Sequence, residues 1–177
     1  MAADAPALRL FFALWPDAAT RSALAALQQG LGAQAGGRLV APENLHLTMA
    51  FLGMEPARLL PAITGVLERI AVPEMTLMVD TFGYFPRARI AWAGLSAPPR
   101  ALMALQAELI GALRQCGIGH DRESVFRPHI TLMRNAAAGG FGVAGPICWK
   151  APRLALVQSA TMARGSTYKV LAEQAPY

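Results

Sequence analysis

Two short stretches of the sequence each place an imidazole and a hydroxyl two residues apart in otherwise apolar surroundings. His46 and Thr48 stand in the stretch HLTM, and His129 and Thr131 stand in the stretch HITL. The chain has three histidines, so two of the three share this four-residue pattern. One copy alone would more often be a core histidine beside a threonine that suits a strand. The repeat favours a functional pair instead.

Two imidazoles and two hydroxyls could together carry out metal-free chemistry at a phosphodiester. Imidazoles titrate near neutral pH, so one can take a proton from water while the other gives a proton to the leaving oxygen. The hydroxyls can donate hydrogen bonds to the anionic oxygens and stabilise charge that develops there. No carboxylate accompanies either histidine at ligand spacing, and the two cysteines form no C-x-x-C pair. We therefore expect neither a metal site nor a cofactor.

A strand is the element that would present these groups together. Side chains alternate between the two faces of a strand, so His46 and Thr48 share one face while Leu47 points to the other. The same alternation puts His129 and Thr131 on one face. If the two strands lie near each other, all four groups converge on one groove. The pattern itself does not establish that the strands meet.

The rest of the chain reads as alternating strands and helices. Helices are expected from about Asp17 to Gln34, from about Pro56 to Ile70, and from a cap in SAPP (96–99) to Gly117. Strands are expected at 8–16, 38–40, 45–52, 75–85, 89–95, 125–134, 146–149, 153–162 and 167–173. The turn PRA (86–88) predicts a hairpin between two of them. The predicted fold class is α+β, with residues 1–177 forming one domain.

Composition narrows the class of protein further. Of the 177 residues 54% are hydrophobic and 15% are charged, which is enough for a large core and argues against disorder. The formal charge of +5 favours anionic partners such as phosphates or nucleic acid. The apolar run at 8–15 is too short to span a bilayer and lacks a signal-peptide cleavage site. We expect a cytoplasmic protein with reduced cysteines and no membrane partner.

With their flanks, the two motifs resemble the two-histidine phosphoesterases, specifically the RNA 2′,3′-cyclic phosphodiesterase (2′-5′ RNA ligase) family. The similar stretches cover nearly the whole chain: RLFFALWPD, ENLHLTMAFLG, PRARIAWAGL, FRPHITLMR and STYKVLAE. The resemblance implies a bilobal α+β fold of two pseudo-symmetric halves of antiparallel strands. It also implies that helices lie outside and that the motif strands meet in a central cleft.

The same resemblance implies a reaction and a role for each motif residue. The 2′,3′-cyclic phosphate at an RNA end would be opened to a 2′-phosphate. His46 would be the proton donor to the leaving 3′ oxygen, and His129 would be the base that activates water. Thr48 and Thr131 would hold the phosphate. The residues themselves do not distinguish the two imidazoles, so the order of acid and base comes from the resemblance.

Several further residues carry weaker predictions. Arg127 would share the face of His129 and could bind phosphate, and Phe51 and Tyr168 could stack on RNA bases. Arg134, counted along the strand from His129, would point to the opposite face unless the strand bends, and we expect it to form a structural salt bridge there. His120 lacks a threonine partner, so it is expected on the surface.

Two other functions remain open. The cleft could bind RNA or nucleotide ends without catalysis, although titratable imidazoles are not needed for binding alone. The site could also run in reverse and join ends through a 2′-5′ bond, with water as the dominant competitor. In each case the expected partner is RNA or a nucleotide. If the protein is an enzyme, that partner carries a 2′,3′-cyclic phosphate. No obligate protein partner is expected, and a monomer is the default.

Overall fold

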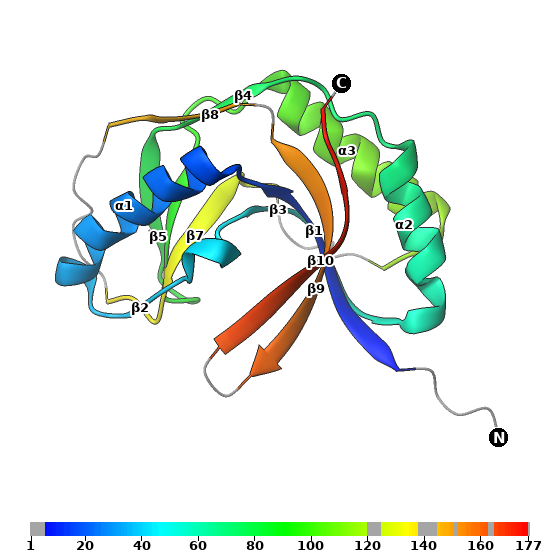
Figure 1. Ribbon diagram of the computed structural model, residues 1–177, viewed down its shortest axis with the longest axis horizontal. Helices are drawn as coiled ribbons and strands as arrows, with labels where there is room; N and C mark the ends of the chain where they lie inside the picture. The colour runs from blue at the N-terminus through cyan, green and yellow to red at the C-terminus, as the bar shows by residue number, and fades with distance from the viewer. Residues whose placement is uncertain (1–5, 120–124, 138–144, 151, 163–164, 177) are drawn as a thin grey trace.

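Most of the strands join one antiparallel sheet, and the helices pack outside it, toward its two ends (Figure 1). The computed structural model describes residues 6–119, 125–137, 145–150, 152–162 and 165–176. The helices are α1 (Ala18–Ala35), α2 (Leu60–Arg69), α3 (Arg100–Gln115) and the short 3₁₀ turns η1 (Pro42–Asn44) and η2 (Ala57–Leu59). The strands are β1 (Ala7–Trp15), β2 (Arg38–Leu39), β3 (Leu47–Pro56), β4 (Thr76–Val79), β5 (Thr81–Phe85), β6 (Ile90–Gly94), β7 (His129–Arg134), β8 (Ile147–Lys150), β9 (Arg153–Met162) and β10 (Gly165–Gln174).

The main sheet has the strand order β10-β9-β1-β3-β7-β6-β5, and β2 adds to β7. The strands β4 and β8 form a separate two-stranded sheet. Helix α1 lies on the side of β2 and β7, whereas α2 and α3 lie together on the other side, near β9 and β10 (Figure 1). Every strand pair is antiparallel. The predicted α+β class with helices outside is confirmed.

The helices bury the faces that their apolar spacing predicts. Leu102, Leu105, Leu109 and Leu113 of α3 are all buried in the main core. Helix α1 begins as expected, because the carboxylate of Asp17 accepts a hydrogen bond of 2.7 Å from the backbone N–H of Thr20. None of the described helices is long and apolar enough to cross a membrane.

Three element boundaries differ from the prediction, each because tertiary pairing overrides local preference. Strand β3 continues to Pro56, since it pairs with β1 over its whole length, and α2 starts only at Leu60. The run 75–85 divides at Asp80, because β4 pairs with β8 and β5 pairs with β6. The hairpin between β5 and β6 is confirmed.

The expected cap of α3 and the start of β7 also differ. Ser96 does not cap the helix: its backbone N–H and hydroxyl donate to the carboxylate of Asp80 at 2.8 and 2.6 Å. Helix α3 begins after Pro99 without a side-chain cap. Strand β7 begins at His129 rather than at residue 125, and Val125 is 82% exposed. His120 lies outside the described residues.

Candidate active site

The two halves of the main sheet meet at a single residue pair. Leu47 of β3 pairs with Ile130 of β7, and no other pair joins these two strands in the described residues. On either side, β3 pairs with β1 and β7 pairs with β6 along most of their lengths. Both residues of the joining pair are fully buried. The sheet therefore divides into two lobes, and the middle residues of the two motifs connect them.

This register brings the four motif side chains together. Because the strands are antiparallel, His46 lies beside Thr131 on one side of the joining pair. On the other side of the pair, Thr48 lies beside His129. Side chains next to a paired residue point to the opposite face from it. All four are only partly buried, whereas the joining pair points into the core. The convergence that the pattern alone left open is present in the structure.

Each motif strand carries an extra residue immediately after its threonine, and β3 carries a second one at Leu52. The register shifts by one residue at Met49 in β3 and at Leu132 in β7, relative to the neighbouring strands. Such a bulge turns the following side chains onto the other face of the strand. As a result Phe51 and Arg134, each three residues beyond a motif threonine, point to the same side as that threonine. The fourth position of each motif is thus a bulge residue.

The bulge in β7 is held from the other side of the sheet by α1. The side-chain amide of Gln28, which is 1% exposed, donates to the carbonyl oxygens of Leu132 and Val40 at 2.7 and 2.9 Å. The N–H of Val40 donates to the same Leu132 carbonyl at 2.9 Å. A buried amide with both protons used therefore ties the backbone of the bulge to the residue that follows β2.

The bulge corrects one prediction about the site. Arg134 does not point away from His129, and within the described part of the chain no carboxylate forms a salt bridge with it. The one ion pair found there joins Arg153 and Glu173. Strict alternation along the strand gave the wrong face because the extra residue was not visible in the sequence.

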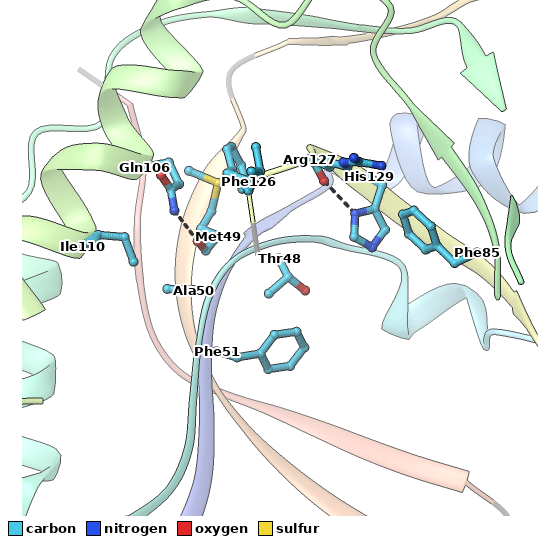
Figure 2. Close-up of a pocket in the computed structure, with 11 residues that line it drawn as sticks. Thr48, Met49, Ala50, Phe51, Phe85, Gln106, Ile110, Phe126, Arg127 and His129 are labelled. Carbon is cyan, nitrogen blue, oxygen red and sulfur yellow. Dashed lines mark hydrogen bonds between the residues drawn. The ribbon is translucent and has the colours of Figure 1, made fainter. Parts of the chain in front are cut away.

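The two catalytic candidates make the same hydrogen bond within their own strands. Nδ1 of His46 lies 2.6 Å from the carbonyl oxygen of Asn44, and Nδ1 of His129 lies 2.7 Å from that of Arg127 (Figure 2 shows the second). A carbonyl oxygen can only accept, so Nδ1 carries the hydrogen in both rings. Nε2 is then left with a free lone pair in the neutral ring and takes the second proton on ionisation.

Aromatic side chains enclose the ring of His46. The indole of Trp15 stacks on it with a centroid distance of 5.3 Å and an interplanar angle of 5°. Phe11 lies at 5.0 Å, and the edge of Tyr168 meets the ring at 5.2 Å. These contacts fix the ring plane and remove water from it.

His129 has a smaller aromatic enclosure built from the hairpin. Phe85 contacts it edge-on with a centroid distance of 5.1 Å, and Trp92 lies at 6.3 Å (Figure 2 shows Phe85 beside the histidine). The indole of Trp92 lies across Gly83, where an added Cβ would be 2.1 Å from the ring. Glycine at this position therefore leaves the space that the tryptophan occupies.

Burial lowers the pKa of both imidazoles. The pKa of His46 falls from its ordinary 6.5 to about 4, chiefly because burial penalises the charged ring, and the positive charges of Arg134 and His129 lower it further. The hydrogen bond to Asn44 acts in the opposite direction. Burial also lowers the pKa of His129, again opposed by its bond to Arg127. Both rings are therefore predominantly neutral at pH 7 in the free protein.

A cavity of about 490 Å³ opens beside the motif residues. Thr48 and His129 line it, with Arg127 at its mouth and Phe51 opposite (Figure 2). Most of the remaining wall is apolar: Met49, Ala50, Phe85, Ile110, Val125 and Phe126, with Gln106 as the other polar residue. We call this the aromatic cavity. Its size lies within the roughly 300–1,000 Å³ range of small-molecule sites.

The predicted secondary residues divide between two sides of the site. Arg127 and Phe51 face the aromatic cavity, and both are exposed, Phe51 by 45%. Tyr168 lies on the other side, packed against His46 and Phe11. In the described residues no group of three histidine, cysteine or acidic side chains could hold a metal ion.

Comparison with known proteins places this geometry in a family. The model of the LigT-like phosphoesterases matches residues 14–92. An RNA 2′,3′-cyclic phosphodiesterase of Escherichia coli is 37% identical over 129 residues, which are 73% of each chain. The chain belongs to the LigT-like phosphoesterase family. A second relative with the same name, from Thermus thermophilus, is 32% identical over 181 residues, covering 93% of this chain and 88% of its own.

Solved structures agree over nearly the whole LigT-like chain. The crystal structure of E. coli LigT in its apo form superposes with a TM-score of 0.83 and 31% identity, covering 97% of this chain and 99% of that one. The same protein complexed with 3′-AMP gives a TM-score of 0.83 and 34% identity. The predicted family and the bilobal fold are therefore confirmed.

Sequence reasoning expected Trp15 and Trp92 in the core or the wall of the groove, but it did not predict the aromatic enclosures of the two imidazoles in this LigT-like site. Phe11 and Trp15 stand at alternate positions of β1, a spacing that puts them on one face, but the whole run reads as core. Phe85 and Trp92 come from opposite strands of the hairpin and meet only when it closes. The two backbone carbonyls that fix the imidazoles leave no signal in side-chain types.

Proposed function

We propose that this protein hydrolyses 2′,3′-cyclic phosphates at RNA ends to 2′-phosphomonoesters without a metal ion. The observation that carries the proposal is the single pair Leu47–Ile130, whose register brings the two histidines and two threonines together, with Thr48 and His129 lining the aromatic cavity. The relatives from E. coli and T. thermophilus are named RNA 2′,3′-cyclic phosphodiesterases.

Acid–base catalysis by the two imidazoles accounts for the whole reaction. Nε2 of His129 takes a proton from water, and the water oxygen bonds to phosphorus. The bond between phosphorus and the 3′ oxygen breaks, and His46 gives its Nε2 proton to that oxygen. The products are a 2′-phosphate and a 3′-hydroxyl, so one water molecule is consumed and the two imidazoles have exchanged protonation states.

The hydroxyls of Thr48 and Thr131 are placed to hold the phosphate between the two rings. Each donates a hydrogen bond to a non-bridging oxygen, whose charge increases as water attacks. Because the threonines lie on rigid strands next to the joining pair, the donors need little rearrangement during the reaction.

Because the pKa of His46 is low, the ring must gain a proton on substrate binding before it can act as the proton donor. A donor must be charged before it acts, yet a pKa of about 4 leaves the free ring almost wholly neutral at pH 7. A bound phosphodiester brings a negative charge beside the ring, and an opposite charge at short range favours the imidazolium. We therefore infer that phosphate binding raises the pKa of His46, so the ring becomes protonated when the substrate is present.

The secondary residues extend the site toward the RNA. The exposed guanidinium of Arg127 at the mouth of the aromatic cavity is placed for a phosphate contact. Phe51 presents its ring to the same cavity and can stack on a base. The ring of Tyr168 supports His46 through an edge contact. If Tyr168 also stacks on a base, it must do so with the face of its ring that does not contact the protein.

We place this activity in the cytoplasm and in one domain that acts without an obligate partner. Both cysteines, Cys116 and Cys148, are exposed and free, which suits a reducing compartment. The catalytic groups come from both lobes of the same chain, so neither lobe alone would hold the site.

The test is a reaction in water enriched in oxygen-18, using a short RNA with a 2′,3′-cyclic phosphate and a second RNA with a free 5′-hydroxyl. Hydrolysis puts one heavy oxygen into the terminal phosphate, and mass spectrometry is expected to show this product. A joined RNA without heavy oxygen would show 2′-5′ ligation instead. Unchanged RNA that remains bound would show an end-binding protein and would overturn the proposal.

A further inference from the structure

Helix α1 buries a glutamine side chain against the main sheet. Gln28 is 1% exposed and lies one turn after Leu24, which is fully buried on the same face of the helix. Its neighbour Gln29 carries the same side chain and is exposed. Burying an amide costs free energy unless its polar groups are hydrogen-bonded, so the partners of Gln28 show what the buried amide does.

The amide of Gln28 bonds two segments that are distant in the sequence. It donates at 2.7 Å to the carbonyl oxygen of Leu132, the residue that follows the motif threonine Thr131. It also donates at 2.9 Å to the carbonyl oxygen of Val40, the residue that follows β2. The N–H of Val40 donates to the same Leu132 carbonyl at 2.9 Å. We call these three bonds the Gln28 clamp, because they hold the backbone of the second motif against the segment that leads into the first.

From Val40, two further hydrogen bonds lead to the ring of His46. The carbonyl oxygen of Ala41 accepts from the N–H of Asn44 at 2.8 Å, which closes the 3₁₀ turn η1. The carbonyl oxygen of Asn44 then accepts from Nδ1 of His46 at 2.6 Å. Because η1 is a single hydrogen-bonded turn, a shift of Val40 relative to β7 would be passed on to the imidazole.

On its other side the Gln28 clamp holds the bulge of β7. Leu132 is the extra residue of this bulge and comes directly after Thr131. A bulge bends its strand and so sets the direction of the side chains next to it. Among the described residues, β3 and β7 pair with each other only at Leu47 and Ile130. The clamp therefore supplies a second connection between the segments that carry the motif groups.

The other lobe has a looser counterpart of this arrangement. Gln106 of α3 donates to the carbonyl oxygen of Met49 at 3.5 Å, and Met49 is the bulge residue after Thr48 (Figure 2). A helix glutamine thus holds the fourth residue of both motifs. Gln106 is only partly buried and lines the aromatic cavity, whereas Gln28 is buried and is not among the residues that line it. Substituting Gln28 therefore leaves the cavity wall unchanged.

We propose that Gln28 is a positioning residue for catalysis, which sets the place of His46 relative to Thr131. The inference rests on the proposed function, in which His46 protonates the leaving 3′ oxygen while Thr131 holds the phosphate. Proton transfer requires donor and acceptor within hydrogen-bond reach, and a misplacement of about 1 Å can lower a rate by about 100-fold. Gln28 acts through the backbone, since its amide protons are both used within the clamp.

The first experiment measures kcat and KM on a short RNA cyclic phosphate for Gln28→Met, which keeps a side chain of similar length but removes both donors. We expect kcat to fall by about 10–100-fold with KM nearly unchanged, because the phosphate is still bound while the proton donor is displaced. Gln29→Met makes the same change at the exposed neighbouring position and is expected to keep the wild-type kcat. Urea unfolding of each variant shows that the protein assayed is folded.

A double-mutant cycle then shows whether Gln28 acts through His46. A residue that only supports the fold should lower kcat by the same factor in the wild-type protein and in His46→Ala. A residue that positions the imidazole should have little further effect once the imidazole is absent. We expect the second result, with single-turnover assays giving the low rates of the His46→Ala background.

The outcomes separate this inference from the proposed function. Wild-type kcat in Gln28→Met, or equal factors in the two backgrounds, would overturn the positioning role and leave the proposed function intact. If Gln28→Met does not fold, Gln28→Asn enters the same cycle under the same two criteria, since it keeps the amide on a shorter side chain that cannot reach both carbonyls. No hydrolysis by the wild-type protein, or full activity in His46→Ala, would overturn the proposed function and this inference with it.

Discussion

Among the residues that the structure describes, Leu47 and Ile130 form the one backbone pair through which β3 and β7 join the two halves of the main sheet. The residues on either side of this pair are the histidines and threonines of the two motifs. A single pair leaves the lobes free to diverge on both sides, which opens space above the motif side chains. The residue pair that joins the two lobes therefore also positions the site.

Replacing either motif histidine is expected to abolish most of the activity. His46→Ala and His129→Ala should each lower kcat by about 10²–10⁴-fold on an RNA cyclic phosphate, because one proton transfer is lost in each. Circular dichroism should show that both variants remain folded. His120→Gln serves as the matched control, since it changes the third histidine, which has no threonine partner. Wild-type kcat in either motif variant would rule out the two-imidazole mechanism.

The pH dependence of the rate should report two imidazoles. In the free protein His46 must be charged and His129 neutral, so kcat/KM is expected to fall on both sides of an optimum below pH 6.5. Bound phosphate raises the pKa of His46, so the alkaline limb of kcat should lie at higher pH than that of kcat/KM. Stopped-flow or steady-state assays across pH 4–9 would measure both limbs, and a single-limb profile contradicts the assignment.

The buried ring of His46 should make the fold sensitive to acid. Its folded pKa of about 4 lies below the unfolded 6.5, so the unfolded chain binds the proton first as the pH falls. This contribution to stability is complete above about pH 6.5 and is lost on going down to about pH 4. Because each unit of pKa corresponds to about 1.4 kcal/mol, the loss is on the order of 3 kcal/mol.

Urea unfolding at a series of pH values measures that loss. The free energy of unfolding of the wild-type protein should decline between pH 6.5 and 4, and the decline should be smaller in His46→Gln, which cannot take up the proton. Parallel declines in the two proteins would show that the ring of His46 is not responsible.

The motif threonines should matter through their hydroxyl groups. Thr48→Ala and Thr131→Ala are each expected to lower kcat/KM by roughly 10–100-fold, the range for losing a hydrogen bond to a charged group. Thr48→Ser and Thr131→Ser keep the hydroxyl and should retain most of the activity. If alanine and serine variants behave alike, the threonines serve the strand rather than the phosphate.

Gly83 should be intolerant of even one added carbon. In Gly83→Ala the new Cβ would meet the ring of Trp92 at 2.1 Å, so the indole must move away from its place beside His129. We expect a loss of about 1–3 kcal/mol in the free energy of unfolding, together with lower kcat. Gly111→Ala in α3, where nothing lies within 4 Å of an added Cβ, should instead be neutral or slightly stabilising. Equal stability of the two variants would contradict the packing described for Trp92.

The sequence predicted the motifs and most elements because these depend on local patterns. The leucines of α3 and the cap at Asp17 follow from helix spacing and capping preference, and both are confirmed. The two motif strands could be recognised as strands for the same reason. That they lie side by side depends on the long-range pair Leu47–Ile130, which the family resemblance implied but no local pattern encodes.

The features that the sequence did not predict come from contacts between distant segments. The bulges at Met49 and Leu132 exist only relative to neighbouring strands, and the second one reversed the predicted direction of Arg134. The position of Arg38 opposite that arginine depends on β2 adding to β7 over only two residues.

The most direct test of the central claim is the reaction of wild-type protein with a short RNA ending in a 2′,3′-cyclic phosphate, in excess EDTA. The position of the resulting phosphate is read by nuclear magnetic resonance of phosphorus. Two imidazoles acting without a metal predict complete conversion to the 2′-phosphate, at a rate that EDTA does not change. Loss of activity in EDTA, or a 3′-phosphate product, would contradict the account.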